Sequence, residues 1–164
     1  MRGVRGVICQ LNISKGGMPK TPILQGEATA AGLAGDVQRN RRYHGGPEKA
    51  LLLVTQGSLD ELVALGYPVY PGAMGENLTV TGLDRRELRS GQRFRAGDAV
   101  IELTTLRQPC RHLDVYGPGI QRAVYQKNGS PGTGPWAMAG FYCRVSHPGF
   151  ISTGDIIELI DHAV

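Results

Sequence analysis

Residues 92–105 read QRFRAGDAVIELTT, and this stretch indicates the fold more clearly than any other part of the chain. Two segments with strand-like composition, residues 92–94 and 99–105, stand on either side of Ala96-Gly97-Asp98. A Gly-Asp pair between two such segments favours a tight chain reversal. We therefore expect an antiparallel hairpin here.

A second Gly-Asp pair, Gly154-Asp155, lies between two further predicted strands, residues 140–145 and 156–160. Short strands that are repeatedly joined by such turns favour a barrel over a doubly wound sheet. The fold class that we predict is mainly β (α+β), a small closed or nearly closed β-barrel with a few short peripheral helices.

The remaining elements follow from hydrophobic periodicity and from helix-end signals. The best helical pattern covers residues 58–65, where Ser58 can cap the helix and Glu61 follows three residues later. Shorter helices are expected from His112 and over residues 120–127, and further strands over residues 4–13, 50–54 and 78–80. No repeat or long linker divides the chain, so we expect a single domain over residues 1–164.

The composition limits the classes of function. The 164 residues include 24 glycines, 18 basic and 14 acidic side chains, which give a formal net charge of +4. This modest positive charge suits an anionic ligand, but the basic residues are too scattered to predict a nucleic-acid surface. No apolar run is long enough for a membrane span, and three widely spaced cysteines do not suggest disulfides. We expect a cytoplasmic protein with reduced thiols.

Cys110 is the main candidate for chemistry. Pro109 is expected to end the preceding strand and to place the cysteine at a strand-to-helix corner, with Arg107, Arg111 and His112 close in sequence. These surroundings favour the thiolate, which is the form that binds metal or attacks an electrophile. A small buried core residue is an equally good reading of Cys110 from the residues alone. Zinc would need paired ligands at short spacing, which the sequence lacks.

The other two cysteines, Cys9 and Cys143, lie inside strand patterns. For both of them we expect a place in the core.

Two glycine-containing loops are candidate anion sites. The first runs from Lys15 to Lys20 and combines two glycines with two lysines, although the local sequence alone slightly favours a solvated turn. The second, residues 39–46, carries three arginines, including Arg41, and places His44 directly before two glycines. A histidine in that position is hard to explain as a core residue, so we expect it to contact a ligand.

Glu76 and Asn77 stand immediately before the strand of residues 78–80. A carboxylate and an amide together could recognise the edge of a pterin ring. They could equally close the turn through local hydrogen bonds.

Taken in order, these pieces resemble the MOSC domain family, named after the C-terminal domain of molybdenum-cofactor sulfurases. The similarity is closest to the small bacterial stand-alone type that is linked to 6-hydroxylaminopurine resistance. Nearly the whole chain carries the resemblance, in the segments Ser14-Lys15-Gly16-Gly17 with Pro19-Lys20, Gly35-Asp36-Val37-Gln38, His44-Gly45-Gly46, Gly75-Glu76-Asn77-Leu78-Thr79-Val80 with Gly82-Leu83, Arg107-Gln108-Pro109-Cys110, and Phe141-Tyr142-Cys143-Arg144-Val145 leading to Gly154-Asp155.

The resemblance implies a molybdenum cofactor (Mo-molybdopterin), with Cys110 as metal ligand or sulfur carrier. It also implies that basic residues near the pocket meet the cofactor phosphate and that Asn77 meets cofactor or substrate. The cofactor-binding residues that we expect are Lys15, Lys20, Arg41, His44, Glu76, Asn77, Arg107 and Arg111. Pyridoxal phosphate binding enters only as an association of the family.

Three functions remain open from the sequence. The first is an oxidoreductase that reduces a small N-hydroxylated substrate with electrons from a separate reductase. The second is a carrier that hands over the cofactor, or sulfur on Cys110, without turnover. The third is an anion-binding scaffold without metal. Two departures from the resemblance are an early end after the last predicted strand and the lack of a tyrosine near the end of residues 51–54.

Overall fold

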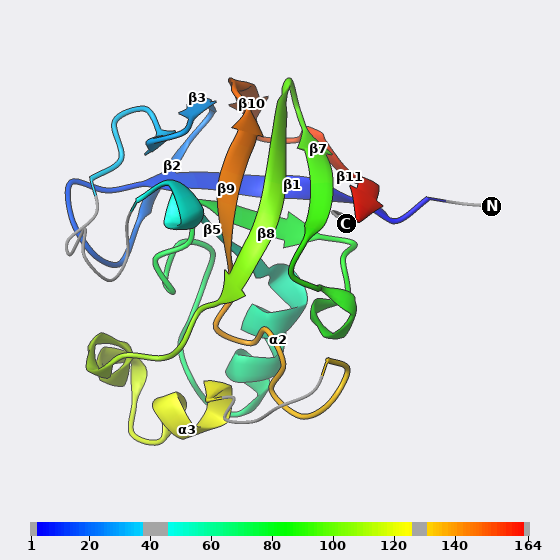
Figure 1. Ribbon diagram of the computed structural model, residues 1–164. Coiled ribbons are helices and arrows are strands. Elements are labelled where there is room, and N and C mark those ends of the chain that lie inside the picture. Colours follow the sequence, from blue (N-terminus) through cyan, green and yellow to red (C-terminus); the bar gives the residue numbers. More distant parts are fainter. Residues whose placement is uncertain (1–2, 38–45, 126–130, 163–164) are drawn as a thin grey trace.

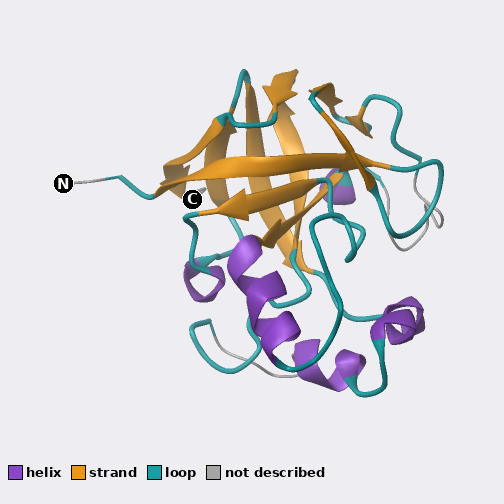
Figure 2. Cartoon of the chain, turned by 180° about the vertical axis from the view of Figure 1, so that it is seen from behind, coloured by secondary structure: helices purple, strands orange, loops and turns teal. Residues whose placement is uncertain are grey.

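The computed structural model describes residues 3–37, 46–125 and 131–162. The strands build a barrel, and most of the helical turns gather at one end of it (Figure 1 and Figure 2). The helical elements of the described residues are η1 Pro47–Lys49, α2 Gln56–Ala64, η2 Arg85–Glu87, η3 Arg111–Tyr116 and α3 Ile120–Val124. None of these helices is long and apolar enough to cross a membrane.

In the described part of the chain, seven strands close into a barrel in the order β1-β6-β5-β9-β8-β7-β11, and β11 returns to pair with β1. The strands are β1 Arg5–Ile13, β5 Leu51–Thr55, β6 Leu78–Thr81, β7 Gln92–Ala96, β8 Ala99–Leu106, β9 Phe141–His147 and β11 Ile156–His162. The expected small closed barrel is confirmed.

One neighbouring pair in this barrel, β5 with β6, is parallel. The other six pairings are antiparallel. Each antiparallel step reverses the strand direction, so a ring of seven strands can close only if the number of parallel pairs is odd. A hairpin cannot join parallel strands, and α2 therefore serves as the crossover between β5 and β6.

The predicted hairpin is present as β7 and β8, with Ala96 opposite Ala99. Gly97 occupies the turn at φ +58°, where an L side chain is disfavoured. A Cβ atom at this position would lie 2.5 Å from the Asp155 side chain and 2.8 Å from the Phe150 carbonyl oxygen. The hairpin therefore requires glycine for two reasons, its backbone conformation and the chain that crosses it.

The second Gly-Asp pair has a different role from the one that we predicted. Between β9 and Gly154 the chain forms β10 (Gly149–Ser152), so the turn leads from β10 into β11 and not from β9. β10 pairs with β3 (Gln25–Thr29), and β3 pairs with β4 (Gly32–Leu33), in a separate small sheet. The sequence also did not predict β2 (Thr21–Ile23), which extends the barrel sheet beside β1.

The helix predicted over residues 58–65 is present, but its start is earlier. Thr55, not Ser58, is the N-cap: its hydroxyl accepts a hydrogen bond from the Ser58 N–H at 3.1 Å. Ser58 is the third helical residue, and its hydroxyl contacts that of Thr55 at 2.8 Å. The helix ends at Ala64, and Gly66 follows with a positive φ of 98°. The cap prediction was therefore wrong by three positions.

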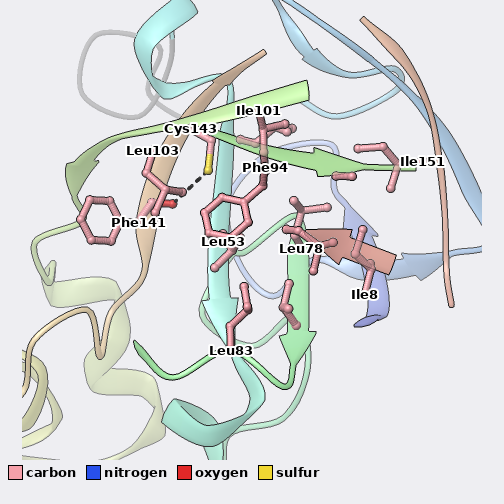
Figure 3. Packing of buried hydrophobic residues seen from close by; sticks show 14 of the residues in the cluster. Ile8, Leu53, Leu78, Leu83, Phe94, Ile101, Leu103, Phe141, Cys143 and Ile151 are labelled. Carbon is pink, nitrogen blue, oxygen red and sulfur yellow. Dashed lines mark hydrogen bonds between the residues drawn. The ribbon is translucent and has the colours of Figure 1, made fainter. Parts of the chain in front are cut away.

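The core has two layers that share the wall strand β5. Leu51 and Leu53 of β5 face the barrel interior, where they meet Phe94, Phe141 and Cys143, as Figure 3 shows for Leu53 and these three residues. Leu52 and Val54 face the opposite way, into a second cluster beneath the helices. This arrangement explains why the predicted strand of residues 50–54 is apolar at every position.

Candidate functional site

Cys110 lies where the chain leaves the barrel wall for the helical end. It follows β8 and the coil of residues 107–109, and it is the residue before η3. Its backbone is extended, with φ −128° and ψ 165°, and its thiol is partly exposed. The predicted strand-to-helix corner is confirmed, although the helix is of the 3₁₀ type. Arg111 and His112 are exposed on η3.

The other two cysteines differ from Cys110. Cys143 is fully buried in the barrel core, as predicted, and burial raises the pKa of its thiol. Cys9 is only partly buried, and its thiol donates to the Thr79 carbonyl oxygen at 3.2 Å. Burial also raises the pKa of Cys9, and a raised pKa favours the protonated form of both thiols.

Arg107 places a buried positive charge three residues before Cys110. Only 6% of the residue is exposed, and its Nη1 donates to the carbonyl oxygens of Met74 at 2.9 Å and Ala139 at 3.3 Å. Its Nε has no hydrogen-bond partner. Within the described residues no carboxylate forms an ion pair with this guanidinium. A buried cation with an open donor is well suited to an anion.

The loop from Ser14 to Lys20 lies next to Arg107. Arg107 Nη2 is 3.8 Å from the Met18 sulfur, and the Met18 side chain covers Gly75. Ser14 stabilises the loop from within: its hydroxyl donates to the Gly17 carbonyl oxygen at 2.8 Å and accepts from the Gly16 N–H at 3.3 Å. These contacts bring three predicted segments together at one end of the barrel.

The outer face of this loop is open. Lys15 is exposed, and its side chain has no partner among the described residues. The backbone N–H groups of Lys15, Gly17 and Met18 are likewise unpaired within the described part of the chain. A Cβ atom added to Gly16 would meet nothing within 4 Å. Free N–H groups, an ammonium group and open space above the backbone are the features of an anion cradle.

Lys20, in contrast, is committed to the interior. It is 8% exposed, and its ammonium group lies 2.7 Å from both carboxylate oxygens of Asp36, whose side chain is 3% exposed. The same carboxylate accepts hydrogen bonds from the Ser14 N–H and from Asn77 Nδ2, both at 2.9 Å. Asp36 was not among the predicted site residues. The only sequence feature that could have pointed to it is the segment Gly35-Asp36-Val37-Gln38, which is one of those that resemble the MOSC family.

Asn77 uses all of its side-chain hydrogen-bonding groups within the protein. Nδ2 donates to Asp36 and to the Asn12 carbonyl oxygen, and Oδ1 accepts from the Leu52 N–H at 3.1 Å. The side chain therefore fastens β1, β5 and Asp36 to one another. These partners lie 25 to 65 positions away in the sequence, so the side chain does not close its turn locally, as one of the two sequence readings expected.

Glu76 is fully buried behind the turn of residues 71–75. Its Oε1 accepts from the Met74 N–H at 3.1 Å, and its Oε2 accepts from the Thr79 hydroxyl at 2.9 Å. Burial raises the pKa of Glu76 to about 6, although these hydrogen bonds favour the carboxylate. Glu76 therefore holds the turn to the start of β6, through Met74 on one side and Thr79 on the other.

A lysine and a tyrosine that the sequence did not single out border the same region. The ammonium group of Lys49 lies 5.0 Å from the centre of the Tyr142 ring. Burial raises the pKa of Tyr142, the guanidinium of Arg107 opposes this effect, and Cys110 adds to it. Tyr142 therefore shares the electrostatic surroundings of Cys110 and Arg107. Its position in the segment Phe141-Tyr142-Cys143 was the available sequence signal.

Two predicted ligand contacts, Arg41 and His44, lie outside the described residues. Among the described residues, no group of three or more His, Cys, Asp or Glu side chains could hold a metal ion. Cys110 thus belongs to no such group among these residues; it follows the buried Arg107 by three positions, and Arg107 contacts Met18 of the glycine-rich loop.

Comparison with known sequences gives a consistent result. The model of one family, the MOSC domain, matches residues 40–158. The chain is 34% identical to the uncharacterized protein YflK of Bacillus subtilis over 130 residues. This aligned region covers 77% of this chain and 54% of YflK. It is 32% identical to protein YiiM of Escherichia coli over 139 residues, and this aligned region covers 80% of this chain and 58% of YiiM. The chain thus spans little more than half the length of these relatives.

Solved structures show the same similarity in three dimensions. YiiM from Geobacillus stearothermophilus superimposes with a TM-score of 0.72 at 25% identity, over 95% of this chain and 75% of that one. YiiM from Escherichia coli gives a TM-score of 0.69 at 25% identity, over 99% of this chain and 71% of that one. The YUAD protein from Bacillus subtilis shares the fold, with a TM-score of 0.75 at 19% identity and coverage of 99% and 98%.

Proposed function

Because this chain belongs to the MOSC domain family, we propose that it binds a molybdenum cofactor between Cys110 and the loop from Ser14 to Lys20. We propose further that it is a molybdoenzyme component that reduces small N-hydroxylated compounds with electrons from a separate reductase. The functional domain would comprise residues 1–164, since β1 and Asp36 precede the matched range and yet contribute to the barrel and to the site.

One observation carries this proposal: the guanidinium of Arg107 is buried, has an unpaired Nε and lacks a carboxylate partner within the described residues. A buried charge without compensation is costly, and an anionic ligand at this position would remove the cost. The partly exposed Cys110 follows three residues later. Thiolate sulfur is a soft ligand, which suits a metal that is bound through a dithiolene.

The rest of the site fits a cofactor that carries a phosphate. Lys15 and the unpaired N–H groups of Lys15, Gly17 and Met18 are available to a phosphate, and the space above Gly16 would admit it. Arg107 would hold the negative charge nearer to the thiol. Lys20, Glu76 and Asn77 would act by fixing these groups in place, because each of them is buried and hydrogen-bonded within the protein.

When bound, the cofactor would supply the redox chemistry, and the protein would supply binding and orientation. The overall reaction breaks the N–O bond of the substrate. Two electrons and two protons convert R–NH–OH into R–NH₂ and water. The electrons would come from the reductase, while Cys110 would hold the metal and Arg107 would stabilise the negative charge beside it.

The experiment is to purify the protein from a host that makes the cofactor and to measure molybdenum and the fluorescent pterin oxidation product. Cys110→Ala should lose molybdenum, whereas Cys9→Ala, a matched thiol outside the site, should retain it. Reduction of 6-hydroxylaminopurine is then measured with a competent electron donor. A wild-type protein without molybdenum, even after reconstitution, would refute the proposal. Bound molybdenum without reduction of 6-hydroxylaminopurine would support a cofactor carrier in place of an enzyme.

A further inference from the structure

The carboxylate of Asp36 joins three separate parts of the candidate site. It accepts hydrogen bonds from the Ser14 N–H, from the ammonium group of Lys20 and from Asn77 Nδ2, at 2.7 to 2.9 Å. Ser14 and Lys20 are the first and last residues of the loop that carries Lys15, and Asn77 comes from the turn before β6. One buried side chain therefore binds both ends of the loop at once.

The neighbouring backbone reinforces this junction. The Val37 N–H donates to the Ser14 carbonyl oxygen at 2.8 Å, so Ser14 is held on both its N–H and its C=O side by residues 36 and 37. At the other end, the Lys20 N–H donates to the Gly72 carbonyl oxygen at 2.9 Å. A Cβ atom on Gly72 would lie 2.2 Å from the Lys20 carbonyl oxygen, so the turn can approach this closely only with glycine. Both ends of the loop are fixed, while its centre remains open.

We infer that Asp36 is the positioning residue of the site, a buried clip that holds the loop from Ser14 to Lys20 in the conformation that presents Lys15 and its N–H groups to an anion. This inference rests on the proposed function only where it assigns anion binding to the loop. The contacts that form the clip do not depend on a cofactor. Lys20 accordingly serves as the counter-ion of the clip. Its charge is neutralised by Asp36, which leaves Lys15 as the exposed ammonium group of the loop.

The charges explain why a carboxylate is needed at this position. Lys20, Ser14 and Asn77 all present donors to Asp36, and one of these donors is a buried cation. An amide in place of the carboxylate would point its own NH₂ group at another donor and would leave Lys20 unpaired. Breaking a buried pair on one side only is strongly destabilising, whereas replacing both partners by apolar groups is often nearly neutral.

The test therefore uses a double variant, Asp36→Leu with Lys20→Met, which removes the clip without leaving a buried charge. Its matched control is Asp161→Leu with Arg93→Met, which removes the partly exposed pair between β11 and β7 (3.1 Å). Amide hydrogen exchange is measured for the peptide that spans residues 14–20 and for the peptides of β7 and β8. Trypsin cleavage after Lys15 is followed by mass spectrometry as the release of fragment 1–15.

In the clip variant we expect exchange in residues 14–20 and cleavage after Lys15 to rise by roughly tenfold or more, with unchanged exchange in β7 and β8. The affinity for inorganic phosphate should fall in parallel, and the control should match the wild type in every readout. Unchanged exchange and cleavage in the clip variant would overturn the inference. Faster exchange throughout the barrel would overturn it as well, because it would show a general packing role. Neither result depends on molybdenum. Failure of the clip inference can therefore be told apart from failure of the proposed function.

Discussion

Arg107 and Glu76 bind opposite sides of the same residue. Arg107 Nη1 donates to the Met74 carbonyl oxygen at 2.9 Å, and the Met74 N–H donates to Glu76 Oε1 at 3.1 Å. The turn of residues 71–75 is thus held from the Cys110 side by a cation and from the barrel side by a carboxyl group. The hydroxyl of Tyr116, in η3, binds the adjacent Ala73 carbonyl oxygen. A change in the charge of Arg107 or of Glu76 should therefore affect this turn and the site beside it.

Glu76 should make the stability of the fold depend on pH. Burial raises its pKa from 4.5 to about 6, so the folded protein binds more protons than the unfolded chain between these two values. The resulting stabilisation is complete below about pH 4.5 and is lost as the pH rises through about 6; it amounts to about 2 kcal/mol at about 1.4 kcal/mol per pKa unit. Urea unfolding of wild type and Glu76→Gln across this range measures the difference. Parallel stability curves for the two proteins would contradict the prediction.

Arg107→Met should weaken ligand binding far more than it weakens the fold. The change removes the open donor and the buried charge, and we expect retention of molybdenum, and affinity for inorganic phosphate, to fall by roughly tenfold or more. The free energy of unfolding should change by less than about 2 kcal/mol, because removing an unpaired charge offsets the loss of two hydrogen bonds. Arg93→Met is the control, since Arg93 lies on β7 in a partly exposed ion pair. Undiminished molybdenum content in Arg107→Met would refute the role of this residue.

The two Gly-Asp turns should respond differently to alanine. A Cβ atom on Gly97 would collide with the Asp155 side chain and the Phe150 carbonyl oxygen, whereas a Cβ atom on Gly154 would meet nothing within 4 Å. Both glycines have a positive φ, so the backbone strain of about 1 kcal/mol is common to both variants. We expect Gly97→Ala to lower the free energy of unfolding by about 1–3 kcal/mol more than Gly154→Ala. Equal losses in chemical denaturation would show that the steric contact is relieved elsewhere.

The barrel strands could be predicted because their signals are local. In β8, Ala99, Ile101 and Leu103 are buried in strict alternation, and such a pattern is visible in the sequence. The short strands β2 and β4 carry too few residues for a periodic pattern, and β3 and β10 pair across more than 100 positions. The helix cap was misplaced because Thr55 is at once the last residue of β5 and the N-cap of α2.

The candidate site could be predicted only where a residue carries its own signal. Pro109 marked the corner at Cys110, and the glycines marked the loop around Lys15. Nothing local shows that Asp36 meets Lys20, 16 positions earlier, and Asn77, 41 positions later. For the same reason the sequence could not show that, of these two lysines in one loop, Lys15 is exposed and Lys20 is buried.

These two lysines give a direct comparison within one loop. Lys20→Met would leave the Asp36 carboxylate buried without its cation, and we expect a loss of about 3–5 kcal/mol in the free energy of unfolding. Lys15→Met should leave stability within about 0.5 kcal/mol of the wild type, since Lys15 is exposed and has no partner among the described residues. The affinity for inorganic phosphate should nevertheless fall in Lys15→Met, because its ammonium group is the free cation of the loop. Chemical denaturation and phosphate titration of both variants separate the two roles. Equal stability losses would show that Lys20 is not the buried partner of Asp36, and unchanged phosphate affinity in Lys15→Met would remove Lys15 from the site.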